Sequence, residues 1–355
     1  MKSEWKECQL GDLITFQRGY DLPKTKMCDG EYPVVGSNGI IGYHNEYTTE
    51  APSITVGRSG NVGTPFLYNG KSWSHNTSLY IKEFKDVYPL FIYYFLKTLD
   101  LKNYAGGSAV PTLNRNHIHS LNVSIPVDID IQKKISSVLS ALDDKIELNN
   151  RMNENLEQQA QAIFKSWFVD FEPFGGVMPD DWYISNLGQI SDISSGKRPN
   201  KKQNLKDNEF NIPLVGASCV MGYTNKYNYD KKILVTGRVG THGVVQRFNS
   251  PCWASDNTLV IQSLYYEYVY QILRKIDYKN LNRGSTQPLI TQSDLKKTEV
   301  IIPTIKIFED FEVTVGCLMQ LWEYNRVENQ RLSALRDTLL PKLMNGEIDV
   351  ENVRI

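Results

Sequence analysis

Residues 131–168, IQKKISSVLSALDDKIELNNRMNENLEQQAQAIFKSWF, decide how this chain is organised. Apolar side chains recur through them at alternating spacings of four and three residues, beginning with Ile135, Leu139 and Leu142 and ending at Trp167. This pattern, kept for about five heptads, predicts a long amphipathic helix with a coiled-coil seam. At 1.5 Å per residue the helix would be about 57 Å long. So narrow an apolar stripe requires a helical partner.

That partner lies near the C-terminus, where residues 308–343 repeat the pattern. The first seam comprises Ile135, Leu139, Leu142, Ile146, Asn149, Asn153, Leu156, Ala160, Ile163 and Trp167, and the second comprises Phe308, Phe311, Val315, Leu318, Trp322, Asn325, Asn329, Leu332, Arg336, Leu339 and Leu343. Antiparallel pairing would set Asn149 against Asn329 and Asn153 against Asn325. Polar residues at core positions fix the register of paired helices at a cost in stability. We hypothesise that these four residues, the seam asparagines, do so here; alternatively, they face solvent or a partner protein.

The chain is also an internal repeat, which is the sign of a duplicated architecture. The stretch GRSGNVG at 57–63 is echoed by GRVGTHG at 237–243, an offset of 180 residues, and Trp73 is echoed by Trp253. Ile125-Pro126 returns as Ile302-Pro303, an offset of 177. The region before each helix mixes short β-rich runs with Gly-, Asn- and Pro-rich turns.

These patterns together predict a mixed α+β fold with a pseudo-two-fold internal repeat. Two globular α/β domains, 1–130 and 175–306, would be joined by two long helices that form an antiparallel coiled coil. The central spacer helix would occupy 131–174, and the C-terminal spacer helix would occupy 307–355.

Composition excludes several classes of protein. The chain has no apolar run near the roughly 20 residues that a membrane-spanning helix needs, so we expect no membrane association. Its five cysteines are scattered and form no CxxC pair, which favours a reducing compartment, the cytoplasm. Net charge is −1, yet residues 175–303 carry an excess of Lys and Arg. That excess could neutralise DNA phosphates or could be an ordinary solvated surface.

Motifs of catalysis are missing from the sequence. Gly70-Lys71-Ser72 resembles the end of a phosphate-binding loop, but Pro65 stands where the first glycine should be. Pro179-Asp180 with Asp230 and Lys232 imitates a nuclease pattern across too long a gap. The histidines lack metal-ligand spacing. We therefore expect no catalytic residues, no metal and no cofactor.

Three strings give the chain a family resemblance: NNRMNENLEQ at 149–158, FKSWFVDF at 164–171 and LLPKLMNGE at 339–347, supported by GSTQ at 284–287. They resemble the DNA-specificity subunits of Type I restriction-modification systems along essentially the whole chain. The resemblance implies a non-catalytic protein whose two domains each bind one half of a bipartite site in double-stranded DNA. The paired helices would set the gap between the half-sites. Two methyltransferase subunits and translocating restriction subunits would complete the complex.

Candidate DNA contacts follow from side-chain chemistry, because Arg pairs bidentately with guanine and Asn or Gln with adenine. In the first domain they are Arg18, Asn38, Tyr43, Arg58, Ser59, Asn61, Ser74, His75 and Arg115; in the second they are Lys197, Arg198, Lys201, Ser218, Tyr223, Arg238, Thr241, His242, Asp256 and Gln287. Arg58 and Arg238 are the strongest candidates, since each lies between glycines at an equivalent loop position where the backbone can approach DNA closely. Alternatively, the glycines serve only the turn, and the histidines are satisfied loop residues.

Two other functional classes stay open. The chain could be a nuclease or methyltransferase in its own right, or a coiled-coil scaffold whose heads bind proteins or sugars. Activity of the purified chain would reveal the first. Failure to bind duplex DNA selectively would reveal the second.

Overall fold

The computed structural model describes residues 4–107, 111–281 and 289–350. Its contacts divide the chain into two compact units, Met1–Asn149 with Val327–Ile355, and Asn150–Arg326. Each unit contains one globular domain and half of each long helix.

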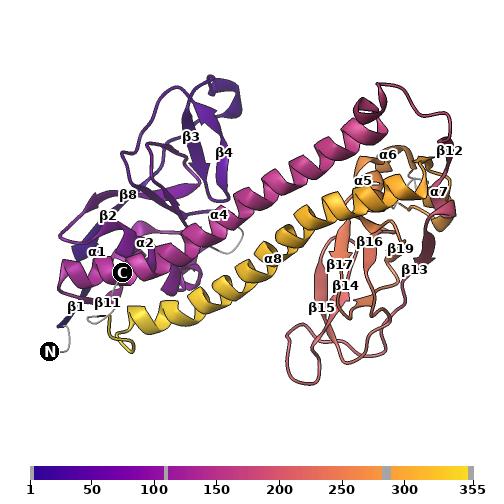
Figure 1. Ribbon diagram of the computed structural model, residues 1–355. Coiled ribbons are helices and arrows are strands. Elements are labelled where there is room, and N and C mark those ends of the chain that lie inside the picture. Colours follow the sequence, from indigo (N-terminus) through magenta and orange to yellow (C-terminus); the bar gives the residue numbers. More distant parts are fainter. Residues whose placement is uncertain (1–3, 108–110, 282–288, 351–355) are drawn as a thin grey trace. The chain divides into compact units, whose positions relative to one another are not determined.

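The globular domain of the first unit contains two principal sheets (Figure 1). The four-stranded antiparallel sheet has the order β2-β8-β5-β6, and the three-stranded sheet has the order β4-β3-β7. Strand β3 pairs antiparallel with β4 and parallel with β7. Small sheets pair β1 with β11 and β9 with β10. The elements are β1 (Trp5–Gln9), α1 (Leu10–Leu13), β2 (Ile14–Arg18), η1 (Lys24–Lys26), β3 (Tyr32–Gly36), β4 (Gly39–His44), β5 (Ser53–Gly57), β6 (Pro65–Tyr68), β7 (Trp73–Ser74), β8 (Ser78–Phe84), α2 (Pro89–Thr98), η2 (Leu101–Tyr104), β9 (Ala105–Gly106), β10 (Thr112–Leu113), α3 (Arg115–His119) and β11 (Asn122–Pro126).

The second unit repeats the topology of the two principal sheets and of the β1–β11 pair. Its four-stranded sheet has the order β13-β19-β16-β17, its three-stranded sheet has the order β15-β14-β18, and β12 pairs with β20. The elements are η3 (Glu172–Phe174), β12 (Tyr183–Asn186), η4 (Leu187–Gln189), β13 (Asp192–Ser195), β14 (Ile212–Val215), β15 (Val220–Thr224), β16 (Ile233–Gly237), β17 (Gln246–Phe248), β18 (Trp253–Ala254), β19 (Thr258–Gln262), α5 (Tyr266–Lys275), α6 (Tyr278–Leu281), α7 (Gln292–Lys296) and β20 (Glu299–Ile302). The predicted duplication is therefore present at the level of strand order and direction.

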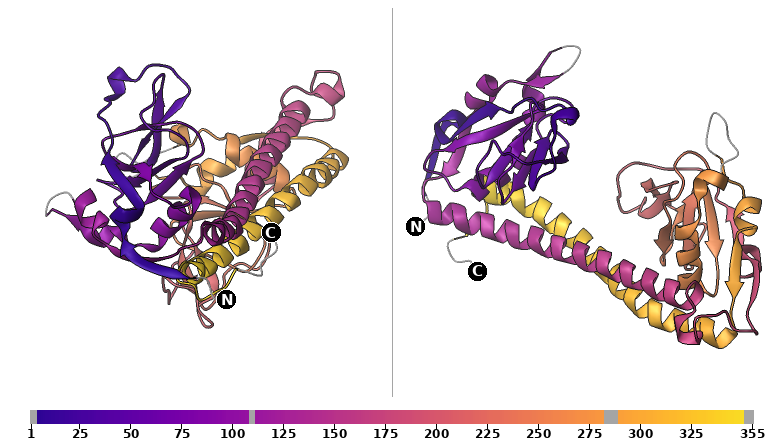
Figure 2. Two further views of the ribbon diagram at one scale, coloured as in Figure 1. Left: turned by 90° about the vertical axis from the view of Figure 1, so that its left-hand side faces the viewer. Right: turned by 90° about the horizontal axis from the view of Figure 1, so that it is seen from above.

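Each core forms where a sheet packs against an apolar helix. All five residues of β5, and all five of β16, are buried, which is the pattern of a strand covered on both faces. Helix α2 adds five buried side chains, among them Phe91, Ile92 and Phe95, to the first core. In the second unit α5 lies against β16 (Figure 2). Both helices are rich in aromatic residues, which supply much of their buried surface.

The two long helices are α4 (Ile129–Phe168) and α8 (Ile305–Met344), each of 40 residues. In the first unit Ile135 and Leu139, near the start of α4, share a core cluster with Leu343, near the end of α8. In the second unit Phe164 contacts Phe311, with ring centroids 6.1 Å apart. Both sets of contacts are antiparallel. Every position of the two predicted seams is buried or half-buried.

The predicted helix limits need small corrections. Helix α4 begins two residues before the expected 131, and α8 begins two residues before the expected 307. Helix α4 ends at Phe168, as the seam pattern predicted, and the rest of the expected spacer 131–174 is a turn in which Phe171 is left-handed (φ 54°) and Gly175 follows with positive φ. Helix α8 ends at Met344, short of the expected 355, and Gly346 has φ 75° just beyond it. The division into two recognition domains and two spacers stays a prediction.

Candidate functional site

The two glycine-flanked loops have the same backbone conformation in both units. Gly60 and Gly240 each have φ 83°, a region that favours glycine. A Cβ on Gly57 would lie 1.8 Å from the carbonyl oxygen of Asn61, and a Cβ on Gly237 would lie 1.9 Å from that of Thr241. Glycine is thus required by the turn itself, as the alternative interpretation held. The turn does not require the side chains of Arg58 and Arg238, which follow the first glycine of each loop.

Backbone hydrogen bonds hold both arginines in place. The N–H of Arg58 donates to Thr77 O at 2.8 Å, and its carbonyl accepts from Leu113 N at 2.8 Å. The N–H of Arg238 donates to Asn257 O at 2.8 Å, and its carbonyl accepts from Ile290 N at 3.0 Å. Each loop is therefore attached to the segment just before a short helix, α3 or α7.

In the first unit this arrangement builds a hollow of about 650 Å³ in which three predicted arginines meet. Arg18 comes from the end of β2, Arg58 from the glycine loop and Arg115 from the first position of α3. The described residues that line the hollow are Gln17, Arg18, Arg58, Leu79, Gly106, Thr112, Leu113, Asn114, Arg115 and His117. None of these is acidic. The arginines lie far apart in sequence, and only the fold brings them together.

The electrostatics of this arginine hollow favour an anionic or acceptor-rich ligand. Burial, with a further contribution from the charge of Arg18, lowers the pKa of Arg58. A phosphate, or the O6 and N7 acceptors of guanine, would relieve that repulsion. Arg58 is already oriented, because its Nη1 donates to Asn76 O at 3.4 Å. Guanidinium groups offer donors in a planar fork that suits either ligand.

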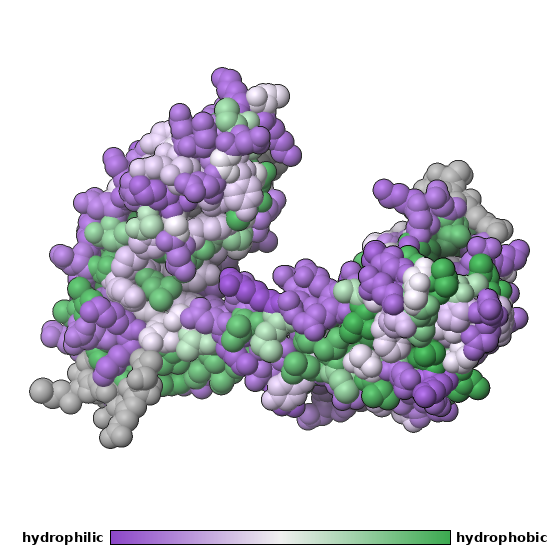
Figure 3. All heavy atoms as spheres, turned by 45° about the horizontal axis from the view of Figure 1, so that its top comes forward, coloured by the Kyte–Doolittle hydropathy of each residue, from purple (hydrophilic) through white to green (hydrophobic). Residues whose placement is uncertain are grey.

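Most remaining candidates lie on exposed turns of the same two domains. Figure 3 shows that hydrophilic residues cover much of the visible surface of the first domain. Asn38 and Ser218 are exposed in the turns of equivalent hairpins, and Tyr43 on β4 is 54% exposed. The other exposed candidates are Asn61, Lys197, Arg198, Lys201, Thr241 and Asp256, whereas Ser59 and Tyr223 are half-buried. Their exposure permits DNA contact, and their roles stay predictions.

Ser74 requires a correction, because its side chain is fully buried and its Oγ lies 2.6 Å from Thr49 Oγ1. It cannot touch DNA from the core. His75 and His242 are half-buried, and each engages its own loop: His75 Nδ1 lies 3.0 Å from Thr77 Oγ1, and His242 Nδ1 lies 3.0 Å from Gly237 O. Burial also lowers the pKa of His75. These contacts favour the alternative of loop residues.

Several residues near the candidate contacts were not predicted from the sequence, and one predicted contact lies where the structure gives no description. Gln17, Asn114 and His117 line the arginine hollow without standing in a motif. In the second unit Gln292, the first residue of α7, donates from Nε2 to Ser195 Oγ at 2.9 Å. The internal repeat, followed from Arg115 with the offset of 177, would have pointed to Gln292. Gln287 lies outside the described residues.

The seam asparagines contact the opposite long helix within each unit. In the first unit Asn149 Nδ2 donates to Asn329 Oδ1 at 2.9 Å and to Glu328 Oε2 at 2.7 Å. In the second unit Asn325 Nδ2 donates to Asn153 Oδ1 at 3.0 Å. Asn149 and Asn325 are buried. The two pairs are those expected from antiparallel pairing.

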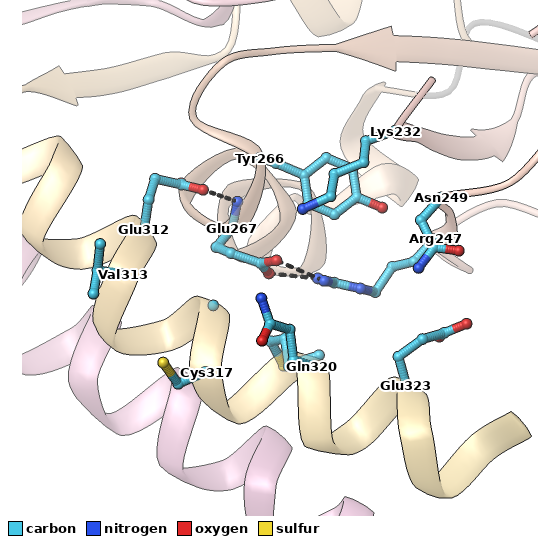
Figure 4. Close-up of a pocket in the computed structure, with 12 residues that line it drawn as sticks. Lys232, Arg247, Asn249, Tyr266, Glu267, Glu312, Val313, Cys317, Gln320 and Glu323 are labelled. Carbon is cyan, nitrogen blue, oxygen red and sulfur yellow. Dashed lines mark hydrogen bonds and ion pairs between the residues drawn. The ribbon is translucent and has the colours of Figure 1, made fainter. Parts of the chain in front are cut away.

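A second cavity, of about 490 Å³, lies where α8 meets the globular domain of the second unit (Figure 4). Arg247 and Glu267 form a bidentate ion pair there, with N–O distances of 2.6 and 2.7 Å and exposures of 10% and 6%. Glu312 of α8 accepts the N–H groups of Glu267 and Tyr268, the first turn of α5, at 3.0 and 2.9 Å. Burial raises the pKa of Glu312 to about 7. The hydrogen bonds of Glu312 attach α8 to the domain. Because Glu267, Glu312 and Glu323 all line the cavity, it is poorly suited to bind DNA phosphates.

Across residues 4–107, 111–281 and 289–350, no helix combines the length and apolar character needed to cross a membrane. Within the same ranges, no three histidine, cysteine, aspartate or glutamate side chains gather as a metal site would require.

Comparison with known proteins agrees with this geometry. The model of the Type I restriction modification DNA specificity domain matches residues 2–158 and 179–332. The Type I restriction enzyme MjaIX specificity subunit of Methanocaldococcus jannaschii is 28% identical over 306 residues, covering 74% of this chain and 70% of that protein. The HindI specificity subunit of Haemophilus influenzae is 26% identical over 334 residues, covering 67% and 71%.

Among solved structures, the S subunit of a Type I restriction-modification system from M. genitalium shares the fold. It aligns over 96% of both chains with a TM-score of 0.69 and 18% identity. Since the family model matches both halves of the repeat and most of the chain, this chain belongs to the Type I restriction modification DNA specificity family.

Proposed function

We propose that each globular domain of this specificity subunit binds one half of a bipartite DNA sequence. The arginine hollow is the observation that carries the proposal. Three arginines from separate elements line it, and none of the described residues that line it is acidic. DNA offers the matching acceptors, both on its phosphates and on its base edges. The repeated loop geometry supports a similar task for the second domain.

The long helices would act as an antiparallel coiled-coil spacer that fixes the gap between half-sites. Antiparallel contacts within each unit and the buried seam positions support this role. The seam asparagines would pin the register, because sliding one helix against the other would break their hydrogen bonds and leave buried amides unpaired. Asn149 Oδ1 already lacks a hydrogen-bond partner among the described residues. Such a polar seam is more easily explained by specificity of pairing than by stability.

We further propose that the outer faces of the helices bind two methyltransferase subunits, with restriction and translocase subunits joining the assembled complex. Exposed apolar side chains on the helices support this: Leu148 is 53% exposed on α4, and Tyr324 and Leu335 are 63% and 47% exposed on α8. Exposed apolar groups of this kind are typical of surfaces that become covered by partners. The chain itself would bind DNA and leave the chemistry to those subunits.

The test is to co-express the full chain with its neighbouring methyltransferase gene and to map modified bases across the host genome. We expect two short half-sites separated by a constant gap. Arg58→Ala should relax only one half-site and Arg238→Ala only the other, whereas Lys82→Gln, at an exposed position of β8, should change neither. Methylation without a bipartite pattern would contradict the proposal.

Incubating the purified chain alone with duplex DNA, Mg²⁺ and S-adenosylmethionine tests the rival enzymatic function. We expect neither cleavage nor methylation under these conditions. A scaffold whose heads bind proteins or sugars would instead fail to shift duplex DNA selectively, even with its methyltransferase partner present.

A further inference from the structure

The arginine hollow has a structural counterpart in the second domain with different side chains. Arg18 is the last residue of β2, and Ser195 is the last residue of the equivalent β13. The residues after them are bound alike: Gly19 N donates to Ser78 O at 3.0 Å, and Gly196 N donates to Thr258 O at 3.1 Å. The two strand ends are therefore equivalent positions.

The helix that borders the hollow is also matched. Arg115 is the first residue of α3 and follows the N-cap Asn114, while Gln292 is the first residue of α7 and follows the N-cap Thr291. Two residues before each, a backbone N–H donates to the carbonyl of the loop arginine, Arg58 or Arg238. The same framework thus presents three arginines in one domain and serine, arginine and glutamine in the other.

In the second domain the amide of Gln292 is positioned to bind an uncharged group that offers one hydrogen-bond acceptor and one donor. Gln292 Nε2 donates one hydrogen to Ser195 Oγ at 2.9 Å, which orients the amide. Its other N–H and its Oε1 make no hydrogen bond within the part of the chain that the structure describes. Adenine presents a matching pair in the major groove, since its N7 accepts and its N6 amino group donates. Guanine presents two acceptors, O6 and N7, which suit a guanidinium.

We propose that these equivalent positions form two readout triplets that specify different bases. In the first domain Arg115, supported by Arg18 and Arg58, would bind the O6 and N7 of guanine. In the second domain Gln292, held by Ser195 beside Arg238, would bind the N6 and N7 of adenine. This inference rests on the proposed function and names the positions that carry its specificity.

The charge difference between the triplets favours base contacts over phosphate contacts. Phosphates are alike in both half-sites, so a pair of phosphate-binding pockets would keep its positive charge in both domains. The second triplet has instead lost two of three positive charges and gained an oriented amide. Such a change is expected if the two domains bind different chemical groups. The bases differ between the two half-sites, whereas the phosphates are the same.

The experiment uses the full chain in complex with its methyltransferase subunits and a pool of duplexes randomised at both half-sites. Arg115→Gln should lower the preference for guanine at one position of the first half-site by about 5- to 150-fold, as expected for a bidentate pair. Gln292→Arg should shift one position of the second half-site from adenine to guanine. A gain of this kind cannot come from misfolding.

The outcomes separate the two proposals. Lys82→Gln, the charge-matched control on β8, should leave both half-sites unchanged. If Arg115→Gln weakens binding equally for all sequences, or if Gln292→Arg leaves the selected base unchanged, the readout triplets are wrong while the DNA-binding function stands. If the unmodified complex selects no bipartite sequence at all, the proposed function itself fails.

Discussion

Replacing Arg247 with methionine should destabilise the second unit by about 3–5 kcal/mol, the range for breaking one half of a buried ion pair. The guanidinium is 10% exposed and makes two hydrogen bonds to a carboxylate that is 6% exposed. It also lies over the rings of Tyr266 and Tyr270, at 4.8 and 4.5 Å from their centroids. Methionine keeps part of the packing but leaves Glu267 buried without its cation.

For a unit of this size, that loss corresponds to a fall of about 6–20 °C in the melting temperature. The measurement is thermal unfolding of the full chain, followed by hydrogen exchange of peptides from α5 and α2. We expect protection to fall in α5, which carries Glu267, and to stay unchanged in α2 of the first unit. Lys231→Met, at an exposed position close in sequence to β16, is the control and should change little.

The double variant Arg247→Met with Glu267→Leu closes the thermodynamic cycle. Replacing both partners by apolar side chains removes the uncompensated charge, so its stability should return to within about 1 kcal/mol of the parent protein. Two results would refute this reasoning: a change below about 1 kcal/mol for Arg247→Met alone, or a double variant as unstable as the single one.

Three further changes test other parts of the structure. Changing all four seam asparagines to leucine should raise the melting temperature, since apolar seams pack better, yet degrade selective DNA binding; unchanged binding would argue against a register role. Arg58→Ala should cost about 1–3 kcal/mol of binding to the preferred half-site, measured by competition with variant duplexes, and equal losses on unrelated DNA would reduce it to a phosphate contact. Glu312 has a pKa of about 7 when folded and about 4.5 when unfolded, so the folded state binds more protons between these values. Stability should therefore fall by about 2–3 kcal/mol as pH rises from 4.5 to 7 and then level off, whereas Glu312→Gln should flatten this profile in chemical denaturation.

Periodicity and repetition carried most of the fold prediction. The spacing of apolar residues located α4 and α8 to within two residues at their starts, because a helix that buries one stripe must repeat it every turn. The repeated motifs predicted two domains of one topology, and the strand orders agree. The same spacing also gave the end of α4 at Phe168, whereas the wider spacer segment 131–174 included a turn in which Phe171 is left-handed, a conformation that the residue type does not predict.

The candidate site was only partly predictable. Arg18, Arg58 and Arg115 were chosen one at a time for their chemistry, and nothing in the sequence says that they share a hollow. Ser74 was chosen on the same grounds and is buried, because the position of a short strand relative to a sheet depends on distant partners. The link between Gln292 and Ser195 spans 97 residues and was not foreseen.

The sequence by itself determined the family, the duplication and the two long amphipathic helices, because these are properties of order and spacing along the chain. Tertiary structure alone decided which side chains meet: three arginines in one domain, serine with glutamine in the other, and a buried ion pair beneath α8. Such meetings depend on how strands and loops pack in three dimensions. Burial and electrostatic interaction act between neighbours in space, whatever their separation in the chain.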